Sequence, residues 1–340
     1  MSKRIAINGF GRIGRAFFKL AITKPELEIV AINDLGELKD FTYLLQHDSV
    51  YGEYKSKVES QKSDGKDYLI IDGKQYLFLS EKDPKKLPWG ELEIDIVVEA
   101  TGAFEGYEKS KFHLDQGAKR VVLTAPAKDE DSADAKTVLM GINEEDLKTC
   151  LISSNGSCTT NSASPVMQIL SEKLGIKKAF LNTVHAYTAS QSLIDGPIKG
   201  GDLKRERAAG VNIVPSTTGA AIAVTRVIGS LKGKFDGMAM RVPVADGSIS
   251  AITFVSERQT TVEEINGILK EAEKEPRWQD IFKTVSDPIV STDIIGDPYA
   301  AITDLSLTKV VDGDLCTVYS WYDNEFGYTV TLVNHVLKIN

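Results

Sequence analysis

The start of the chain carries two apolar runs separated by a stretch with helical spacing. Residues 5–8 (IAIN) are apolar and meet glycine at once, and Ile13 and Phe17 then recur at the spacing of one helix face. A second apolar run, residues 28–33 (EIVAIN), follows a lysine-proline break. The pattern predicts a strand, a helix and a second strand, which form the βαβ unit of a parallel sheet.

Further apolar runs in the first half alternate with polar or helical connections. They lie at residues 94–99, 121–124, 138–141 and 151–154. This alternation predicts an α/β fold with a doubly wound, Rossmann-type parallel sheet. In residues 56–80, Asp64-Gly65 and Asp72-Gly73 separate β-rich stretches, and such pairs favour hairpin turns. We therefore expect an antiparallel appendage there.

The pattern changes past about residue 158. Longer β runs lie at residues 179–184, 238–244, 249–256 and 315–322. With an Asp312-Gly313 turn and a capping-box pattern at 261–264 that opens a helix to about 273, they predict an α+β domain with a mixed, largely antiparallel sheet. Residues 188–212 read as a long polar loop, and loops of that length in compact domains are usually functional.

The length and the change of pattern predict two domains. A chain of 340 residues corresponds to about two domains at roughly 150 residues each. We place the first at residues 1–157 and the second at 158–324. The helical face of residues 328–339 indicates that a C-terminal helix, about 325–340, packs back on the first domain.

Composition and charge exclude several classes of protein. Hydrophobic residues make up 42% and charged residues 26%, as in soluble globular proteins. The 48 acidic and 40 basic residues give a net charge of −8, which offers no electrostatic footprint for nucleic acid or an anionic membrane. No apolar stretch is long enough to span a membrane, and the start lacks a signal-peptide core, so we expect a cytoplasmic protein. Three cysteines without CxxC spacing argue against a disulfide framework, and we expect no metal site.

Residues 9–14 (GFGRIG) match the GxGxxG dinucleotide fingerprint. The motif follows a predicted strand, opens a helix and has Asp34 twenty residues after its last glycine, at the end of the second strand. Such a carboxylate can bind the ribose hydroxyls of NAD, whereas a 2′-phosphate ~4 Å away would cost on the order of 4 kcal/mol per charge pair. The alternative is a plain turn with a capping aspartate. The expected NAD contacts are Gly9, Gly11, Arg12, Ile13, Gly14 and Asp34.

One cysteine and one histidine stand in places that suit chemistry. Cys158 lies among polar residues between the 151–154 strand and a predicted helix, and a helix N-terminus can lower the pKa of a thiol from about 8.5 to as little as about 3.5. His185 follows the 179–184 strand. They can form a nucleophile and base, but the sequence does not show that they touch. A buried structural cysteine and a structural histidine remain the alternatives, and the structural reading holds for the other three histidines.

Several longer sequence motifs match one known family. They include INGFGRIGR, DIVVEATG, TAPAKD, SNGSCTTN, STTGAA, GMAMRVP and SWYDNEFGY. Through them the chain resembles glyceraldehyde-3-phosphate dehydrogenase of the phosphorylating type along essentially its whole length. The resemblance implies an NAD-binding first domain, a catalytic second domain and a homotetramer in which the 188–212 loop lines a neighbouring subunit's cofactor pocket.

The resemblance also implies a mechanism. Cys158 would attack the aldehyde of glyceraldehyde 3-phosphate as a thiolate, hydride would pass to NAD, and inorganic phosphate would cleave the thioester to give 1,3-bisphosphoglycerate. His185 would lower the pKa of Cys158 and accept the hydroxyl proton. The implied site for the substrate phosphate is Thr188 and Arg241, and that for inorganic phosphate is Ser157, Thr159, Arg207, Thr218 and Gly219. Further implied cofactor contacts are Lys82, Thr101, Thr124, Asn324 and Tyr328.

Some residues depart from the family pattern. Ser162 stands where the family often has a second cysteine, which excludes an internal disulfide with Cys158 at that position. Gly156 replaces a usual alanine, and Val244-Ala245 departs from a usual threonine-containing segment. Two rivals stay open: erythrose-4-phosphate dehydrogenase, which deacylates with water, and a catalytically silent NAD-binding protein.

Overall fold

A computed structural model describes residues 2–198 and 200–339. The chain divides into two compact units. The first comprises the chain up to Val138, Glu144–Gly156 and the chain from Leu332 onward, and the second comprises Leu139–Asn143 and Ser157–Thr331.

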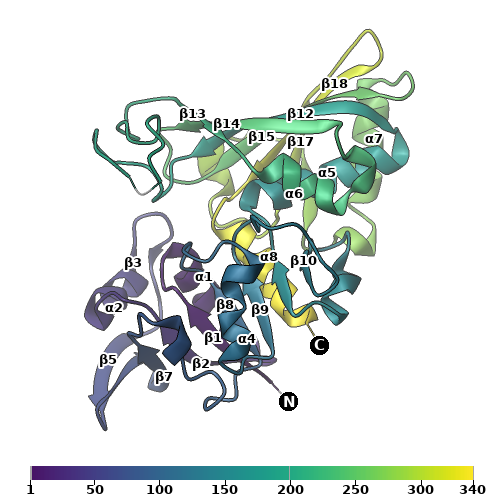
Figure 1. The fold of residues 1–340 in the computed structure, drawn as a ribbon. Helices are drawn as coiled ribbons and strands as arrows, with labels where there is room; N and C mark the ends of the chain where they lie inside the picture. The colour runs from purple at the N-terminus through teal and green to yellow at the C-terminus, as the bar shows by residue number, and fades with distance from the viewer. Residues whose placement is uncertain (1, 199, 340) are drawn as a thin grey trace. The chain divides into compact units, whose positions relative to one another are not determined.

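The first unit is built on a nine-stranded sheet with the order β10-β11-β9-β8-β1-β2-β7-β6-β5 (Figure 1). Its strands are β1 (Lys3–Asn8), β2 (Leu27–Asn33), β5 (Val58–Ser63), β6 (Lys66–Ile71), β7 (Lys74–Leu79), β8 (Ile96–Glu99), β9 (Arg120–Leu123), β10 (Ala135–Thr137) and β11 (Ile152–Ser154). Neighbours from β10 to β7 are parallel, and α1 connects β1 to β2 while α3 and α4 lie between β8 and β9. The helices are α1 (Arg12–Ala21), α2 (Leu38–Gln46), α3 (Tyr107–Ser110) and α4 (Phe112–Asp115), and a small ribbon pairs β3 (His47–Asp48) with β4 (Gly52–Glu53). The predicted Rossmann-type sheet is confirmed.

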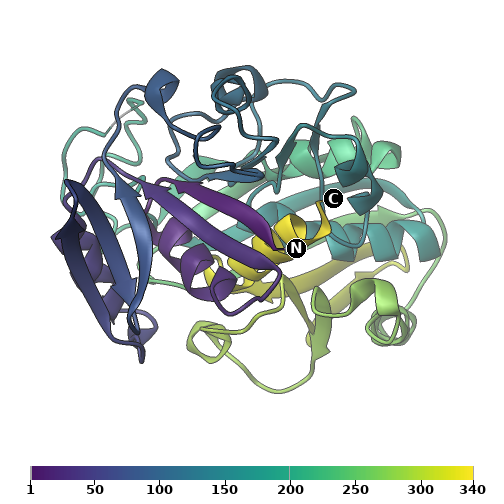
Figure 2. The ribbon, with the colours of Figure 1, turned by 90° about the horizontal axis from the view of Figure 1, so that it is seen from below.

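Two details of this sheet differ from the sequence expectation. The hairpin turns at Asp64-Gly65 and Asp72-Gly73 are present with positive φ at all four residues, but β7 pairs with β2, so the hairpins extend the main sheet (Figure 2). The strand expected at residues 138–141 is wrong. Oδ1 of Asn143 accepts a hydrogen bond from the N–H of Leu139 at 2.9 Å, where the chain turns. Strand β10 therefore ends at Thr137.

The second unit holds a seven-stranded mixed sheet with the order β13-β14-β12-β15-β18-β17-β16. Its strands are β12 (Ile176–Ala186), β13 (Val214–Thr217), β14 (Phe235–Val242), β15 (Ser248–Ser256), β16 (Phe282–Val285), β17 (Ala301–Val311) and β18 (Leu315–Tyr322). Only β12–β14 and β16–β17 are parallel pairs, which confirms the predicted α+β sheet. The helices are α5 (Cys158–Lys173), α6 (Ala220–Val227) and α7 (Val262–Ala272). Thr261 caps α7 by accepting a hydrogen bond from the N–H of Glu264, as the sequence predicted.

The last helix, α8 (Phe326–Lys338), begins in the second unit and ends in the first. Leu332, Val333 and Val336 are buried, and the Lys3 ammonium donates to the carbonyl oxygen of Leu337 at 2.6 Å. This contact joins the final turns of α8 to the start of β1.

Candidate active site

A cavity of about 370 Å³ opens at the carboxyl ends of the strands in the first unit. Strand β1 lies between β2 and β8, so the direction of winding reverses there, and such switch points are where α/β sheets bind ligands. The sequence-predicted residues Gly9, Gly11, Asp34, Lys82 and Thr101 all line this cavity. The structure therefore brings most of the predicted cofactor residues of the first unit together.

Two of the three fingerprint glycines occupy places that larger residues could not. Gly9 has φ of 99°, and a Cβ there would lie 2.5 Å from the main chain of Ala100. A Cβ on Gly14 would lie 2.1 Å from the carbonyl oxygen of Gly9, so this glycine lets α1 pack against β1. Gly11, the N-cap of α1, has open space beside it. A tight turn, close helix packing and an accessible helix N-terminus are what a bound pyrophosphate needs.

Backbone amides hold the carboxylate of Asp34 at the pocket. Its two oxygens accept hydrogen bonds from Phe10 N at 2.6 Å and Gly36 N at 3.1 Å. Arg12 and Ile13 form the first turn of α1, and the Arg12 side chain pairs with Asp48.

Thr124 is not among the residues that line the cavity. Its hydroxyl donates to the carbonyl oxygen of Glu99 at 3.1 Å.

In the second unit, Cys158 and His185 meet. The Sγ of Cys158 lies 3.3 Å from Nε2 of His185. Cys158 is the first residue of α5, and the hydroxyl of Ser157 caps this helix by accepting from the N–H of Thr160. His185 stands one residue before the end of β12, and the parallel register with β14 sets it directly opposite Arg241. Three residues that are distant in sequence are therefore brought together by one helix start and two paired strands.

The two nitrogens of His185 have partners that leave its tautomer open. Nδ1 lies 2.7 Å from the carbonyl oxygen of Ala186, which can only accept, and 2.8 Å from Nη1 of Arg241, which can only donate. A proton on Nδ1 leaves Nε2 as an acceptor toward the sulfur. When Arg241 donates to Nδ1, the proton sits on Nε2 instead. The imidazole can therefore serve as a base or as a donor at the same sulfur.

Burial dominates the ionisation of this pair. It raises the pKa of the Cys158 thiol above its ordinary value, although Arg241 and hydrogen bonds from Thr159 act in the opposite direction. Burial, with the charge of Arg241, lowers the pKa of His185 to about 3. The ligand-free site therefore favours a neutral thiol beside a neutral imidazole.

The residues predicted to bind phosphate have varied surroundings. Thr218 and Gly219 immediately precede α6, whose N-terminal end carries a partial positive charge that favours an anion. Thr159 is buried, and its hydroxyl lies 3.0 Å from that of Tyr322. Thr188 hydrogen-bonds Ser190 at 2.9 Å.

Sequence reasoning placed Arg207 at the phosphate site, but the structure directs a different arginine inward. Arg207 is 63% exposed at its side chain and pairs with Asp195 at 3.0 Å. Arg205, 22% exposed, donates to Ser216 and lies near enough to depress the pKa values of His185 and Arg241. The loop has no periodicity, so the sequence carries no signal to separate these two arginines.

Ser248 is a second residue that sequence reasoning missed. Its hydroxyl accepts from the N–H of Ala186 at 3.1 Å and donates to Oδ1 of Asn324 at 2.7 Å. Because Oδ1 of Asn324 accepts from Ser248, the Nδ2 of this amide points away from Ser248. Tyr328, predicted beside the cofactor, is buried in the first turn of α8.

Among the described residues, no helix could span a membrane and no group of three histidine, cysteine or acidic side chains could hold a metal ion.

A dinucleotide fingerprint together with a cysteine–histidine pair defines a cysteine-dependent dehydrogenase that uses a nicotinamide dinucleotide. Family profiles described as "Glyceraldehyde 3-phosphate dehydrogenase, NAD binding domain" and "Glyceraldehyde 3-phosphate dehydrogenase, C-terminal domain" match residues 3–107 and 157–324. The chain belongs to the glyceraldehyde-3-phosphate dehydrogenase family.

Named relatives cover nearly the whole chain. The glyceraldehyde-3-phosphate dehydrogenase of Thermotoga maritima is 49% identical over 97% of this chain and 97% of its own length. That of Clostridium pasteurianum is 45% identical over 97% of this chain and 96% of its own length. That of Geobacillus stearothermophilus is 43% identical over 98% and 97% respectively.

Proposed function

We propose that this protein oxidises glyceraldehyde 3-phosphate with NAD and inorganic phosphate, giving 1,3-bisphosphoglycerate and NADH in glycolysis or gluconeogenesis. The observation that carries the proposal is the 3.3 Å contact between Cys158 and His185, with Arg241 on the adjoining strand. The first unit would bind NAD as a domain of residues 1–157 completed by the helix at about 325–340. The second would carry the chemistry as a domain of residues 158–324.

The residues of the second unit can perform each step. The sulfur of Cys158 bonds to the aldehyde carbon, and its proton ends on the former aldehyde oxygen as a hemithioacetal. His185 Nε2 accepts that hydroxyl proton while hydride leaves, and a thioester results. A phosphate oxygen then attacks the thioester carbon and the sulfur leaves as a thiolate. Bound NAD supplies the hydride acceptor.

Charged and hydroxyl groups near the pair suit the two phosphates. We propose Thr188 and Arg241 for the substrate phosphate, and Ser157, Thr159, Thr218 and Gly219 with an arginine of the 188–212 loop for inorganic phosphate. The position of Arg205 makes it a better candidate for that arginine than Arg207. For the cofactor, we propose that the orientation of Asn324 presents Nδ2 as the donor to the nicotinamide carboxamide, beside Tyr328.

The loop after β12 supports a homotetramer. It carries Leu193, Ile194, Leu203 and Val211, whose side chains are 75–79% exposed in the single chain. Clustered exposed apolar side chains on one loop are typical of an interface with another subunit. The free cysteines, including the reactive one, suit the reducing conditions of the cytoplasm, where we place the protein.

The decisive assay is NADH formation from glyceraldehyde 3-phosphate, with inorganic phosphate present or omitted. We expect turnover to require phosphate and NADP to replace NAD poorly. Equal rates without phosphate would reject the phosphorylating reaction, and a preference for erythrose 4-phosphate would favour the water-using relative. Binding of NAD with no turnover of either aldehyde would favour the silent alternative.

A further inference from the structure

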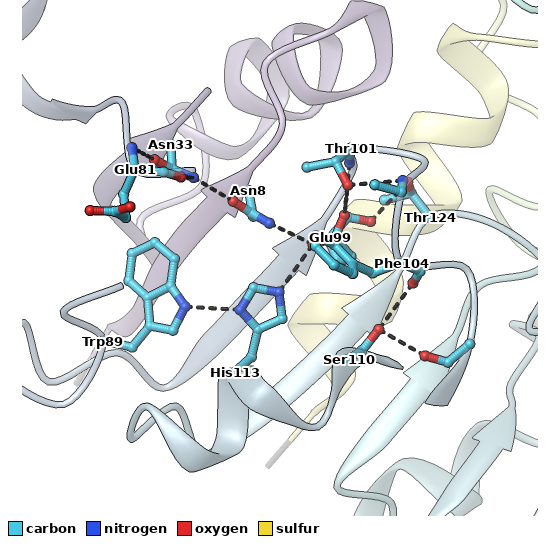
Figure 3. A network of polar contacts seen from close by, with 12 residues as sticks. Asn8, Asn33, Glu81, Trp89, Glu99, Thr101, Phe104, Ser110, His113 and Thr124 are labelled. Atoms are coloured by element: carbon cyan, nitrogen blue, oxygen red, sulfur yellow. Dashed lines mark hydrogen bonds and ion pairs between the residues drawn. The ribbon is translucent and has the colours of Figure 1, made fainter. Parts of the chain in front are cut away.

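A buried carboxylate lies beneath the dinucleotide pocket of the first unit. Glu99, the last residue of β8, is 3% exposed and sits in a polar network that joins the ends of three adjacent strands (Figure 3). Asn8 ends β1 and Asn33 ends β2, and both line the cavity. The proposed reaction uses none of these three side chains.

Every side-chain partner of the Glu99 carboxylate is a donor. Oε2 accepts from Nδ2 of Asn8 at 2.6 Å and lies 3.0 Å from Nε2 of His113. The indole N–H of Trp89 donates to Nδ1 of His113 at 2.9 Å, so the imidazole proton must sit on Nε2 and point at Glu99. Oε1 accepts from both the N–H and the hydroxyl of Thr101. An ionised carboxylate, which only accepts, satisfies this set completely.

The polarity of the network continues to the opposite wall of the pocket. Because Nδ2 of Asn8 faces Glu99, its Oδ1 faces Asn33 and accepts from Nδ2 there at 2.8 Å. Oδ1 of Asn33 then accepts from the N–H of Glu81 at 2.8 Å, next to the cavity-lining Lys82. Nδ2 of Asn33 also donates to the carbonyl oxygen of Glu81 at 3.1 Å, so the Glu99 carboxylate at one end and the main chain of Glu81 at the other fix the same direction of hydrogen bonds.

The consequence falls on Thr101, which is exposed at the cavity. Its hydroxyl proton is committed to Glu99, and its oxygen accepts from the N–H of Ala103 at 3.0 Å. A hydroxyl oxygen has two lone pairs, so one remains. Toward a ligand, this hydroxyl can only accept.

We propose that Glu99 is a positioning residue for the cofactor, which fixes Thr101 as an acceptor for a hydroxyl or amino group of the bound dinucleotide. The inference rests on the proposed use of NAD. It also predicts that a phosphate oxygen, which brings no proton, is disfavoured beside Thr101.

Glu99→Gln tests this role because every group around the carboxylate donates a hydrogen bond to it. The NH2 of glutamine would face one of these donors and could not accept from it. In the least disruptive orientation the amide oxygen keeps Asn8 and His113, and the new NH2 faces Thr101. The Thr101 hydroxyl then accepts from Gln and its proton turns toward the cavity. Loss of a matched hydrogen bond of this kind corresponds to about a tenfold weaker Kd for NAD.

The experiment measures NAD binding by calorimetry, together with KM for NAD, kcat and thermal unfolding, in the full-length protein. We expect Glu99→Gln to raise Kd and KM for NAD about tenfold, with kcat at saturating NAD changed by less than about threefold. Trp89→Phe is the control, because it removes a donor that is three hydrogen bonds away from Thr101. It should lower the melting temperature while leaving Kd for NAD within about twofold.

A double-mutant cycle with Thr101→Val shows whether Glu99 acts through Thr101. If it does, adding Glu99→Gln to Thr101→Val changes Kd by less than about twofold. Full additivity, unchanged NAD affinity in Glu99→Gln, or an equal loss of affinity in Trp89→Phe would each overturn the inference. A wild-type protein that binds NAD weakly or not at all would instead count against the proposed function.

Discussion

Each unit contains a buried histidine with partners on both ring nitrogens, and the two are built differently. His113 in the first unit has a donor-only indole on one side and an acceptor-only carboxylate on the other, so its proton has one place to sit. His185 in the second unit has a thiol on one side, and on the other both an acceptor and the donor Arg241. The first histidine is locked and the second is not.

The difference separates positioning from chemistry. A histidine with a fixed proton can hold a carboxylate in place, because both nitrogens are engaged in bonds that define its tautomer. The Nε2 of His185 faces a sulfur, and its Nδ1 can either donate to Ala186 or accept from Arg241. Such a histidine can switch between proton acceptor and proton donor during a reaction. Burial alone does not distinguish the two, since both are at most 3% exposed.

The largest expected effect comes from removing the sulfur beside the unlocked histidine. Cys158→Ala should lower kcat/KM by about 10⁴-fold or more, because no covalent intermediate can form, while NAD still binds. Steady-state kinetics and calorimetry measure the two properties. Cys316→Ala is the matched control: this cysteine is buried in β18 of the same unit, and the variant should keep its activity. An active Cys158→Ala would refute the assigned nucleophile.

The next largest effect tests the two histidines against each other. His185→Asn should lower kcat by about 10²- to 10⁴-fold through loss of the proton acceptor. His113→Asn should act mainly on stability, by about 1–3 kcal/mol, because it leaves the Trp89 indole without its acceptor and removes one of the two side-chain donors to Oε2 of Glu99. Kinetics and urea unfolding on both variants measure this. If His113→Asn lost as much kcat as His185→Asn, the distinction between a locked and an unlocked histidine would fail.

The sequence predicted local features better than long-range ones. The glycine motif and Asp34 depend on a single βαβ unit, so their geometry follows from neighbouring residues. The contact between Cys158 and His185 depends on how a helix packs on a sheet, and sequence reasoning could only place each at the end of an element. Which arginine of the 188–212 loop is more buried depends on the path of an irregular loop, so the sequence could not separate Arg205 from the more exposed Arg207.

The same limit explains the polar network and the ionisation of the thiol. Glu99 lies in a recognisable motif, but its partners Asn8 and His113 come from β1 and α4, and Trp89, which fixes His113, comes from the segment before β8, so no spacing reveals the network. The position of Cys158 at a helix start indicated that hydrogen bonds there lower the pKa of its thiol, as those from Thr159 do. The depth of burial, which outweighs that help, is set by the packing of the whole unit.

A third prediction concerns the pH at which the sulfur reacts. Since burial raises the pKa of Cys158, alkylation of the ligand-free protein by iodoacetamide should be slow at pH 7 and rise about tenfold per pH unit beyond the ordinary thiol range. With the pKa of His185 at about 3, no second inflection should appear between pH 5 and 8.

Adding NAD sharpens this test. The proposed mechanism requires the positive nicotinamide to reach the sulfur, so NAD should move the alkylation curve to lower pH, and ADP-ribose, which lacks that ring, should not. A reactive thiolate already present at pH 7 without ligand would show that the site is less desolvated than its structure indicates.

The smallest expected effect uses another buried histidine of the first unit. His335 lies 2.7 Å from the hydroxyl of Ser153, and burial lowers its pKa to about 3. The unfolded chain, with an ordinary value near 6.5, binds the proton more tightly, so stability should fall as pH drops from about 6.5 toward 3. His335→Gln should remove about 1.4 kcal/mol per pH unit from this slope, measured by urea unfolding between pH 5 and 6. An identical slope in His335→Gln would mean that this imidazole is already protonated in the folded protein, and burial would then be no guide to which of the histidines carries charge.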